Sequence, residues 1–168
     1  MTWLCVRQTF PNAETLIIWQ GGTDVIHFVA SKDSGLQLSP ADVAYPLRKQ
    51  LMSLLDLIEG NLGEMVARGT GAGWKVYLVT YYPMSIEKAC AQLGLELDAQ
   101  RGQVIDSYLS ALNERIRRAV KQHGAGLIDV AAIGEELKSD AGNHFDCNHL
   151  SQHGNARVSG LVAESLGR

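Results

Sequence analysis

An aspartate and a histidine near the end of the chain have the spacing of an acid–base pair. Asp146 and His149 stand three positions apart in "FDCNHLSQHG", directly before an apolar helical segment. At this spacing a carboxylate can hold one imidazole nitrogen while the other nitrogen faces a substrate, as a general base requires. A simpler interpretation is that Asp146 or Ser151 caps the last helix and that His149 is an ordinary polar residue. The spacing alone favours this simpler interpretation.

Two further stretches carry groups that could take part in chemistry. In "WQGGTDV", Gly21 and Gly22 allow a tight turn and a close approach of the backbone to a ligand, and Thr23 and Asp24 follow them. This turn lacks the later glycines of a dinucleotide-binding fingerprint and the lysine of a phosphate-binding loop. The stretch "SKDSGLQL" offers Ser34 as a hydroxyl nucleophile, although an ordinary surface turn explains it more simply.

A zinc site is another interpretation of the region around Asp146. Its four potential ligands are His144, Cys147, His149 and His153. His149 and His153 are four positions apart, as two ligands on one helical face would be. Gly154 makes the helical register there uncertain, and no second cluster supplies the usual remaining ligands. We therefore expect neither a metal nor a cofactor.

Short apolar runs alternate with long helical patterns, and these elements must position the reactive groups. The runs cover residues 15–20, 75–82 and 126–130. Their continuous hydrophobicity is typical of parallel strands that are covered on both faces. Helical spacing predicts a helix that begins at the Ser39 cap, a second that ends at Gly124, and a last one that begins near Ser151. The sequence thus predicts one domain over residues 1–168, a three-layer α/β/α sandwich with a mainly parallel, flavodoxin-like sheet.

In order and spacing, four stretches resemble about two thirds of an SGNH, or GDSL-type, hydrolase, at its carboxyl-terminal side. They are "TLIIWQGGTDV", "KVYLVTYYPM", "LNERIRRAVKQHGAGLIDV" and "DCNHLSQHGNARVSGLVAESL". Members of this family are α/β proteins that hydrolyse carboxylic esters. The resemblance implies that Asp146 and His149 are the acid and base of a catalytic triad. It also implies that the turn from Gly21 to Asp24 replaces a Gly-x-Asn-Asp block, with Gly21, Gly22 and Thr23 holding the oxyanion.

The chain departs from this family pattern in two ways. The Gly-Asp-Ser block with the nucleophilic serine is missing, and so is the next glycine block, so we expect a fold truncated at its N-terminus. Thr23 stands where the family has an oxyanion asparagine, and losing one such donor typically costs about 2.7–4 kcal/mol of transition-state stabilisation. Ser34 follows the glycine turn instead of preceding it. Three interpretations stay open: a hydrolase of small esters, a non-catalytic binding or oligomerisation module on the same fold, and a fragment of a longer reading frame.

Composition and charge set the remaining expectations. A net charge of -3 gives no electrostatic reason to expect nucleic acid as a partner. No apolar run approaches the roughly 20 residues that a membrane span needs, so we expect a soluble, cytoplasmic protein. The three cysteines, Cys5, Cys90 and Cys147, are far apart and suit reduced thiols better than a disulfide framework.

Truncation would leave the first apolar run at an open sheet edge, where unpaired backbone groups invite association. Either the chain's own start or a second copy of the chain could cover this edge. We therefore expect a homodimer through the N-terminal sheet edge. The residues expected in or near the contact are Trp3, Leu4, Val6, Ile17 and Trp19.

Overall fold

A small parallel sheet forms the middle layer of the fold. The structure is a computed structural model that describes residues 12–33, 45–85, 88 and 99–167. Its strands are β1 (Thr15–Ile18), β2 (Lys75–Val79) and β3 (Gly126–Ile128). They lie in the order β1-β2-β3 and pair in parallel, with Tyr77 opposite both Ile17 and Gly126. The sequence therefore predicts all three strands, but each ends earlier than its apolar run.

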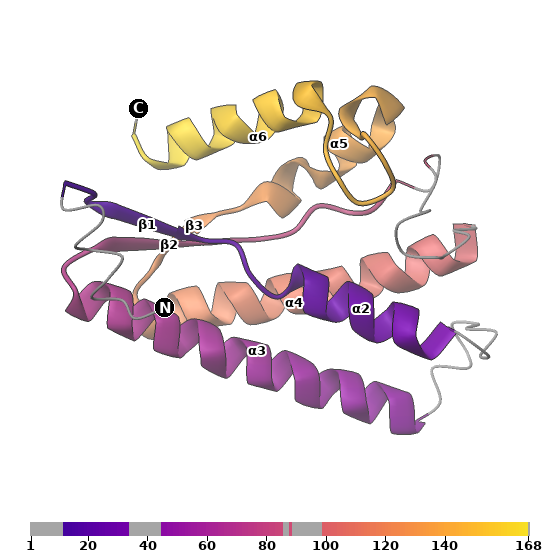
Figure 1. Ribbon diagram of the computed structural model, residues 1–168, viewed down its shortest axis with the longest axis horizontal. Coiled ribbons are helices and arrows are strands. Elements are labelled where there is room, and N and C mark those ends of the chain that lie inside the picture. Colours follow the sequence, from indigo (N-terminus) through magenta and orange to yellow (C-terminus); the bar gives the residue numbers. More distant parts are fainter. Residues whose placement is uncertain (1–11, 34–44, 86–87, 89–98, 168) are drawn as a thin grey trace.

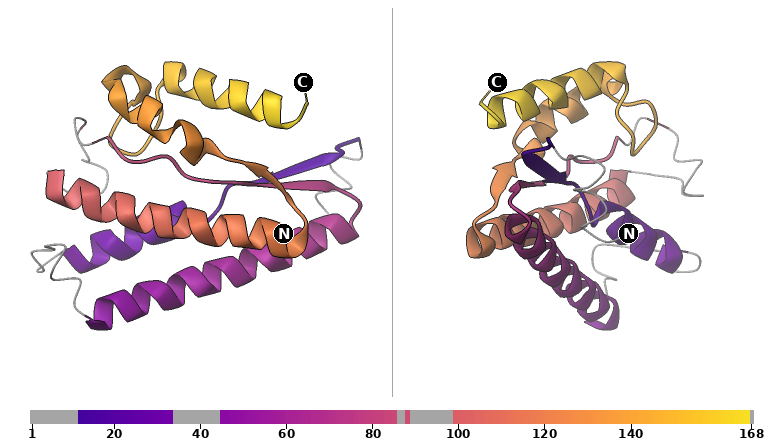
Figure 2. Two further views of the ribbon diagram at one scale, coloured as in Figure 1. Left: turned by 180° about the vertical axis from the view of Figure 1, so that it is seen from behind. Right: turned by 60° about the vertical axis from the view of Figure 1, so that its left-hand side comes forward.

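Helices cover both faces of this sheet (Figure 1, Figure 2). The helices on one face are α2 (Gly22–Asp33), α3 (Tyr45–Gly71) and α4 (Ala99–His123). The other face carries the 3-10 helices η2 (Val130–Ile133) and η3 (Ala141–Asn143), with α5 (Gly134–Ser139) and α6 (Gln152–Ser165). Side chains of β2 alternate between the two faces: Val76 and Leu78 join the core under α2, α3 and α4, whereas Tyr77 and Val79 join the core under α6. The predicted α/β/α sandwich is confirmed.

Helix α2 is an element that the sequence patterns did not predict. We expected a loop after the first strand, yet the helix begins directly at Gly22. Gly21 has a φ of 109°, which favours glycine, and its carbonyl accepts the Val25 amide at 3.2 Å to close the first turn. Val25, Ile26 and Val29 then bury an apolar stripe in the core. The two glycines therefore turn the chain straight from β1 into a helix.

Two predicted helix boundaries are confirmed. Gly124, with a φ of 69°, follows the end of α4. Ser151 caps α6, because its hydroxyl accepts the Gly154 amide at 3.3 Å. The predicted Ser39 cap lies outside the described residues.

Strand β1 pairs on one side only in the part of the chain that the structure describes. Ile17 on this strand is 42% exposed. Trp19, which follows this strand, packs against Tyr81 and Tyr82. The other residues expected there, Trp3, Leu4 and Val6, lie outside the described residues. Among the described helices, none combines the length and hydrophobicity that crossing a bilayer requires.

Candidate functional site

Asp146 and His149 form a hydrogen-bonded pair in the loop between η3 and α6. The His149 Nδ1 atom lies 2.8 Å from Oδ2 of Asp146. The other carboxylate oxygen, Oδ1, accepts the backbone amides of Asn148 at 2.8 Å and His149 at 2.7 Å. The carboxylate therefore fixes both the loop and the orientation of the imidazole, and a neutral His149 would carry its proton on Nδ1.

The Asp146 carboxylate is stabilised in its charged form. Burial raises its pKa, but the hydrogen bonds from the His149 ring and from the two amides outweigh burial, so the pKa falls below its ordinary value of 3.8. The Asp146 side chain is 16% exposed, whereas the His149 side chain is 59% exposed. The imidazole thus has one nitrogen held by a carboxylate and the other, Nε2, available for proton transfer.

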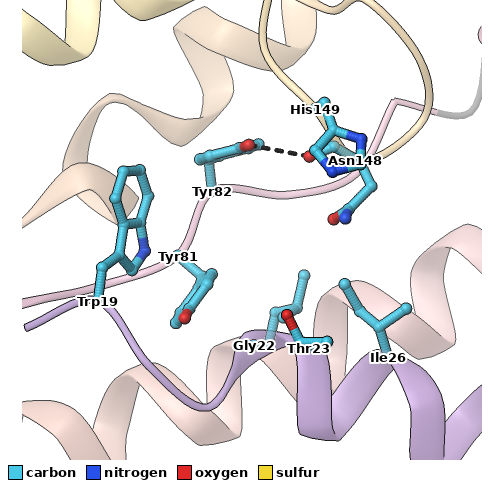
Figure 3. A pocket seen from close by; sticks show the side chains of 9 residues that line it. Trp19, Gly22, Thr23, Ile26, Tyr81, Tyr82, Asn148 and His149 are labelled. Carbon is cyan, nitrogen blue, oxygen red and sulfur yellow. Dashed lines mark hydrogen bonds between the residues drawn. The ribbon is translucent and has the colours of Figure 1, made fainter. Parts of the chain in front are cut away.

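A cavity of about 270 Å³ joins this pair to the glycine turn. Its described lining residues are Trp19, Gly22, Thr23, Ile26, Tyr81, Tyr82, Leu109, Asn148 and His149 (Figure 3). Trp19 follows β1, and the two tyrosines follow β2. The residues from Gly22 to Ile26 belong to the start of α2, Asn148 and His149 precede α6, and Leu109 comes from α4. The site thus lies beyond the carboxyl ends of the strands, where parallel α/β sheets bind ligands.

The predicted site residues differ in where they lie relative to this cavity. Gly22, Thr23 and His149 line it. Gly21 is buried beneath it, and a Cβ there would lie 2.8 Å from Cγ2 of Ile58. Asp24 is exposed in the first turn of α2 and is not among the lining residues. Ser34 lies outside the described residues.

The Tyr81 ring packs against Gly22, one of the residues predicted to hold an oxyanion. A Cβ on Gly22 would lie 2.2 Å from the Tyr81 ring, so the ring packs directly on the glycine backbone. Burial raises the pKa of Tyr81, and the charge of Asp24 adds to the rise, so the Tyr81 hydroxyl is protonated at neutral pH.

Tyr82 connects β2 to the loop of Asp146 and His149. Its hydroxyl donates a hydrogen bond to the Asn148 carbonyl at 2.9 Å. Burial raises the pKa of Tyr82 to about 12, so this phenol stays protonated and remains a donor. Behind it, the ring of His144 meets the Tyr82 ring edge-on, with the centroids 5.9 Å apart. Sequence reasoning treated Tyr81 and Tyr82 as strand residues, and the signal it passed over is two consecutive tyrosines at the end of the central strand.

The backbone on either side of the loop is also fixed. His144 and Leu150 form an isolated antiparallel bridge that closes the loop. The Ser151 amide donates to the Asn143 carbonyl at 2.8 Å, and the Ser85 amide donates to the Cys147 carbonyl at 2.9 Å. The acid–base pair is therefore held by the segment after β2 as well as by its own turn.

Two expectations about this region need correction. Cys147 is disulfide-bonded, so the expectation of reduced thiols is wrong for this residue. The zinc hypothesis also fails, because the described residues hold no group of three or more metal ligands that could bind an ion. Cys147 offers no thiolate, the His144 ring packs against Tyr82, and His153 is exposed on α6.

Comparisons with known proteins support the fold. No protein-family profile matches the sequence, and no curated protein is significantly similar to it. Among solved structures, the chain is similar to LAE5, an alpha/beta hydrolase enzyme from the metagenome of Lake Arreo, Spain, with a TM-score of 0.58 and 19% identity. The match covers 98% of this chain and 66% of that one, so the chain spans just under two thirds of that protein's length. The chain therefore shares the α/β fold of this structure.

Proposed function

We propose that this chain carries the acid–base half of a serine-type ester hydrolase site of the SGNH, or GDSL, kind. The observation that supports the proposal is that His149, oriented by Asp146, lines the same cavity as Gly22 and Thr23. This arrangement suits acyl transfer, because a base, His149, faces the N-terminus of α2 and the Thr23 hydroxyl across the cavity. The fold shared with LAE5 is consistent with this reading.

In this proposal, His149 Nε2 takes the proton from an attacking hydroxyl as that oxygen bonds to the ester carbonyl. Asp146 stabilises the resulting imidazolium through Nδ1. Negative charge that develops on the carbonyl oxygen meets the Thr23 hydroxyl and the positive end of the α2 dipole. When the carbon–oxygen bond to the alcohol breaks, the imidazolium returns its proton to the leaving alkoxide, so that His149 ends neutral. If the nucleophile is a serine, water then attacks the acyl-enzyme with the same proton transfers through His149 and releases the acid.

No serine is among the described lining residues, and this proposal uses the Thr23 hydroxyl for the oxyanion. Tyr81 and Tyr82 both have raised pKa values, which makes their phenolates scarce at neutral pH. We therefore assign the nucleophile to a serine outside the described residues, Ser34 included, or to water activated by His149. Both sources need the same base.

Hydrolysis of p-nitrophenyl acetate by the wild type and by His149→Ala tests the proposal. General-base catalysis predicts a loss of at least about a hundredfold in kcat/KM for the variant. Glu164→Gln, an exposed change on α6, serves as the control and should match the wild type. A fluorophosphonate probe then separates the two nucleophiles, because an activated serine is labelled and a water mechanism is not. Equal rates in wild type and His149→Ala, or no hydrolysis by either, would refute catalysis.

A non-catalytic binding or oligomerisation module is the second candidate function. It is favoured by the exposed Ile17 on β1, which has a neighbouring strand on one side only within the described residues. Light scattering of the wild type and Ile17→Lys tests it. A wild-type dimer that the variant converts to a monomer supports the oligomerisation module, and a wild-type monomer at micromolar concentration excludes that module.

A further inference from the structure

Three aromatic side chains form one side of the cavity, which we call the aromatic wall (Trp19, Tyr81 and Tyr82). The Trp19 ring lies 5.9 Å from the Tyr81 ring at 51° and 6.2 Å from the Tyr82 ring at 76°. These separations and tilts are those of mutually stabilising aromatic pairs. Figure 3 shows the wall on one side of the open space and His149 with Asn148 on the other.

One hydroxyl of the wall is already used, because Tyr82 donates to the Asn148 carbonyl. What the wall chiefly offers a ligand is aromatic surface, to which Ile26 and Leu109 add aliphatic surface. A sugar ring, whose hydroxyls each need a partner, fits such a surface less well than an aromatic ring does.

The charges around the cavity select against an ionised ligand. No lysine or arginine is among the described lining residues. Two carboxylates act on lining residues: Asp146 holds His149, and the charge of Asp24 reaches Tyr81. An anion would find no lysine or arginine among the described lining residues and would be repelled by both carboxylates, so a neutral ligand is favoured.

We propose that the cavity binds a small neutral ligand with an aromatic ring, placed against the aromatic wall with its carbonyl group toward Thr23 and His149. For the hydrolase proposed above, on which this assignment of substrate class rests, the substrates are aryl or benzyl esters of small acids. The cavity of about 270 Å³ accommodates one ring and a short acyl group.

Binding of ketones tests this without requiring turnover, because a ketone cannot be hydrolysed. Acetophenone and cyclohexyl methyl ketone have the same size class and carbonyl group and differ in aromaticity. Their dissociation constants are measured by isothermal titration calorimetry, which applies equally to variants that lack Trp19. In the wild type, the indole N–H resonance of Trp19, identified from its disappearance in Trp19→Phe, checks that the ligand binds at the wall. We expect acetophenone to bind about three- to tenfold more tightly than the cyclohexyl ketone. Benzoate, which is charged, and N-acetylglucosamine, which is a neutral sugar, should shift the resonance least.

Three variants test whether acetophenone binding depends on the aromatic wall. Trp19→Leu should weaken acetophenone binding about three- to tenfold, and Trp19→Phe should stay within about twofold of the wild type, since a ring is retained. Phe145→Leu, which removes an aromatic side chain that is 74% exposed and not among the lining residues, is the matched control and should leave binding unchanged. Thermal unfolding checks that each variant is folded; if Trp19→Leu is not, Tyr81→Leu replaces it.

Equal affinity for the two ketones, tighter binding of benzoate or the sugar, or no acetophenone binding up to its solubility would overturn the inference. These results are independent of catalysis. Acetophenone binding without ester hydrolysis would refute the hydrolase and keep the aromatic site. Hydrolysis of phenyl acetate no faster than that of cyclohexyl acetate, with equal ketone affinities, would refute the aromatic site and keep the hydrolase.

Discussion

The side-chain amide of Asn113 pairs with both backbone groups of Tyr81. Its Oδ1 accepts the Tyr81 amide at 2.7 Å, and its Nδ2 donates to the Tyr81 carbonyl at 2.8 Å. Asn113 comes from α4 and is 5% exposed. It replaces the two strand hydrogen bonds that Tyr81 would otherwise need, so β2 can end and direct Tyr81 and Tyr82 to the cavity.

Asn113→Leu should therefore destabilise the protein by about 1–3 kcal/mol, because two buried backbone groups at Tyr81 lose their partners. Urea unfolding measures the change. Gln122→Ala, an exposed change on the same helix, should shift the free energy of unfolding by less than about 0.5 kcal/mol. Equal stabilities of Asn113→Leu and the wild type would contradict the role assigned to Asn113.

Asp146→Asn should make stability less dependent on acid pH. The pKa of Asp146 is lowered in the folded state, so its contribution is fully present above the ordinary value of 3.8 and is lost as the pH falls through the folded value. The variant should be less stable than the wild type by about 1–3 kcal/mol at neutral pH. The difference should shrink as the pH falls below 3.8 in urea unfolding. A difference that stays constant over this range would argue against a charged, hydrogen-bonded Asp146; Glu135→Gln, on the exposed side of α5, is the control.

Tyr82→Phe should loosen the loop that holds His149. The variant loses the hydrogen bond to the Asn148 carbonyl, at a cost of about 0.5–1.5 kcal/mol. Hydrogen exchange should become faster at the amides of Asn148 and His149, while the helices keep their protection. If the chain hydrolyses esters, kcat should fall more than KM rises.

Tyr108→Phe is the matched control for that variant. Its buried hydroxyl has no hydrogen-bond partner among the described residues, so its removal should leave stability unchanged or raise it. Equal exchange rates in Tyr82→Phe, Tyr108→Phe and the wild type would show that the Tyr82 hydroxyl does not hold the loop.

Two glycines of α6 should respond in opposite ways to alanine. A Cβ at Gly154 would lie 2.2 Å from the Asn143 carbonyl oxygen, so Gly154→Ala should cost about 1–3 kcal/mol. Gly160 has open space around it, so Gly160→Ala should stabilise the helix by up to about 1 kcal/mol. Thermal unfolding of both variants checks the contrast, and two shifts of the same sign would contradict it.

Local patterns in the sequence predict the layers of this fold well. The apolar runs around Leu16, Leu78 and Ile128 form the strands, because strands covered on both faces cannot tolerate polar residues. Gly124 and Ser151 mark helix ends through their own backbone and side-chain chemistry. Helix α2 was missed because a pair of glycines followed by a short apolar stripe is also the pattern of a turn.

The candidate site is predicted only in part, because its geometry depends on contacts between distant residues. The spacing of Asp146 and His149 predicts their hydrogen bond, since the two residues lie only three positions apart in the chain. The positions of Tyr81 and Tyr82 depend instead on Asn113 and on the Asn148 carbonyl, which are far away in the sequence. No local pattern carries such information. The aromatic character of the cavity therefore became evident only in three dimensions.

The bridge between His144 and Leu150 gives the acid–base loop a degree of independence from its surroundings. Inside this loop, Asp146 bonds to the ring and amide of His149 and to the Asn148 amide, so the turn itself holds the imidazole in its orientation. The position of the loop in the molecule depends instead on the Tyr82 hydroxyl and the Ser85 amide. The same segment, transplanted between a strand and a helix of an unrelated host, should keep its oriented imidazole but would need new donors for the Asn148 and Cys147 carbonyls.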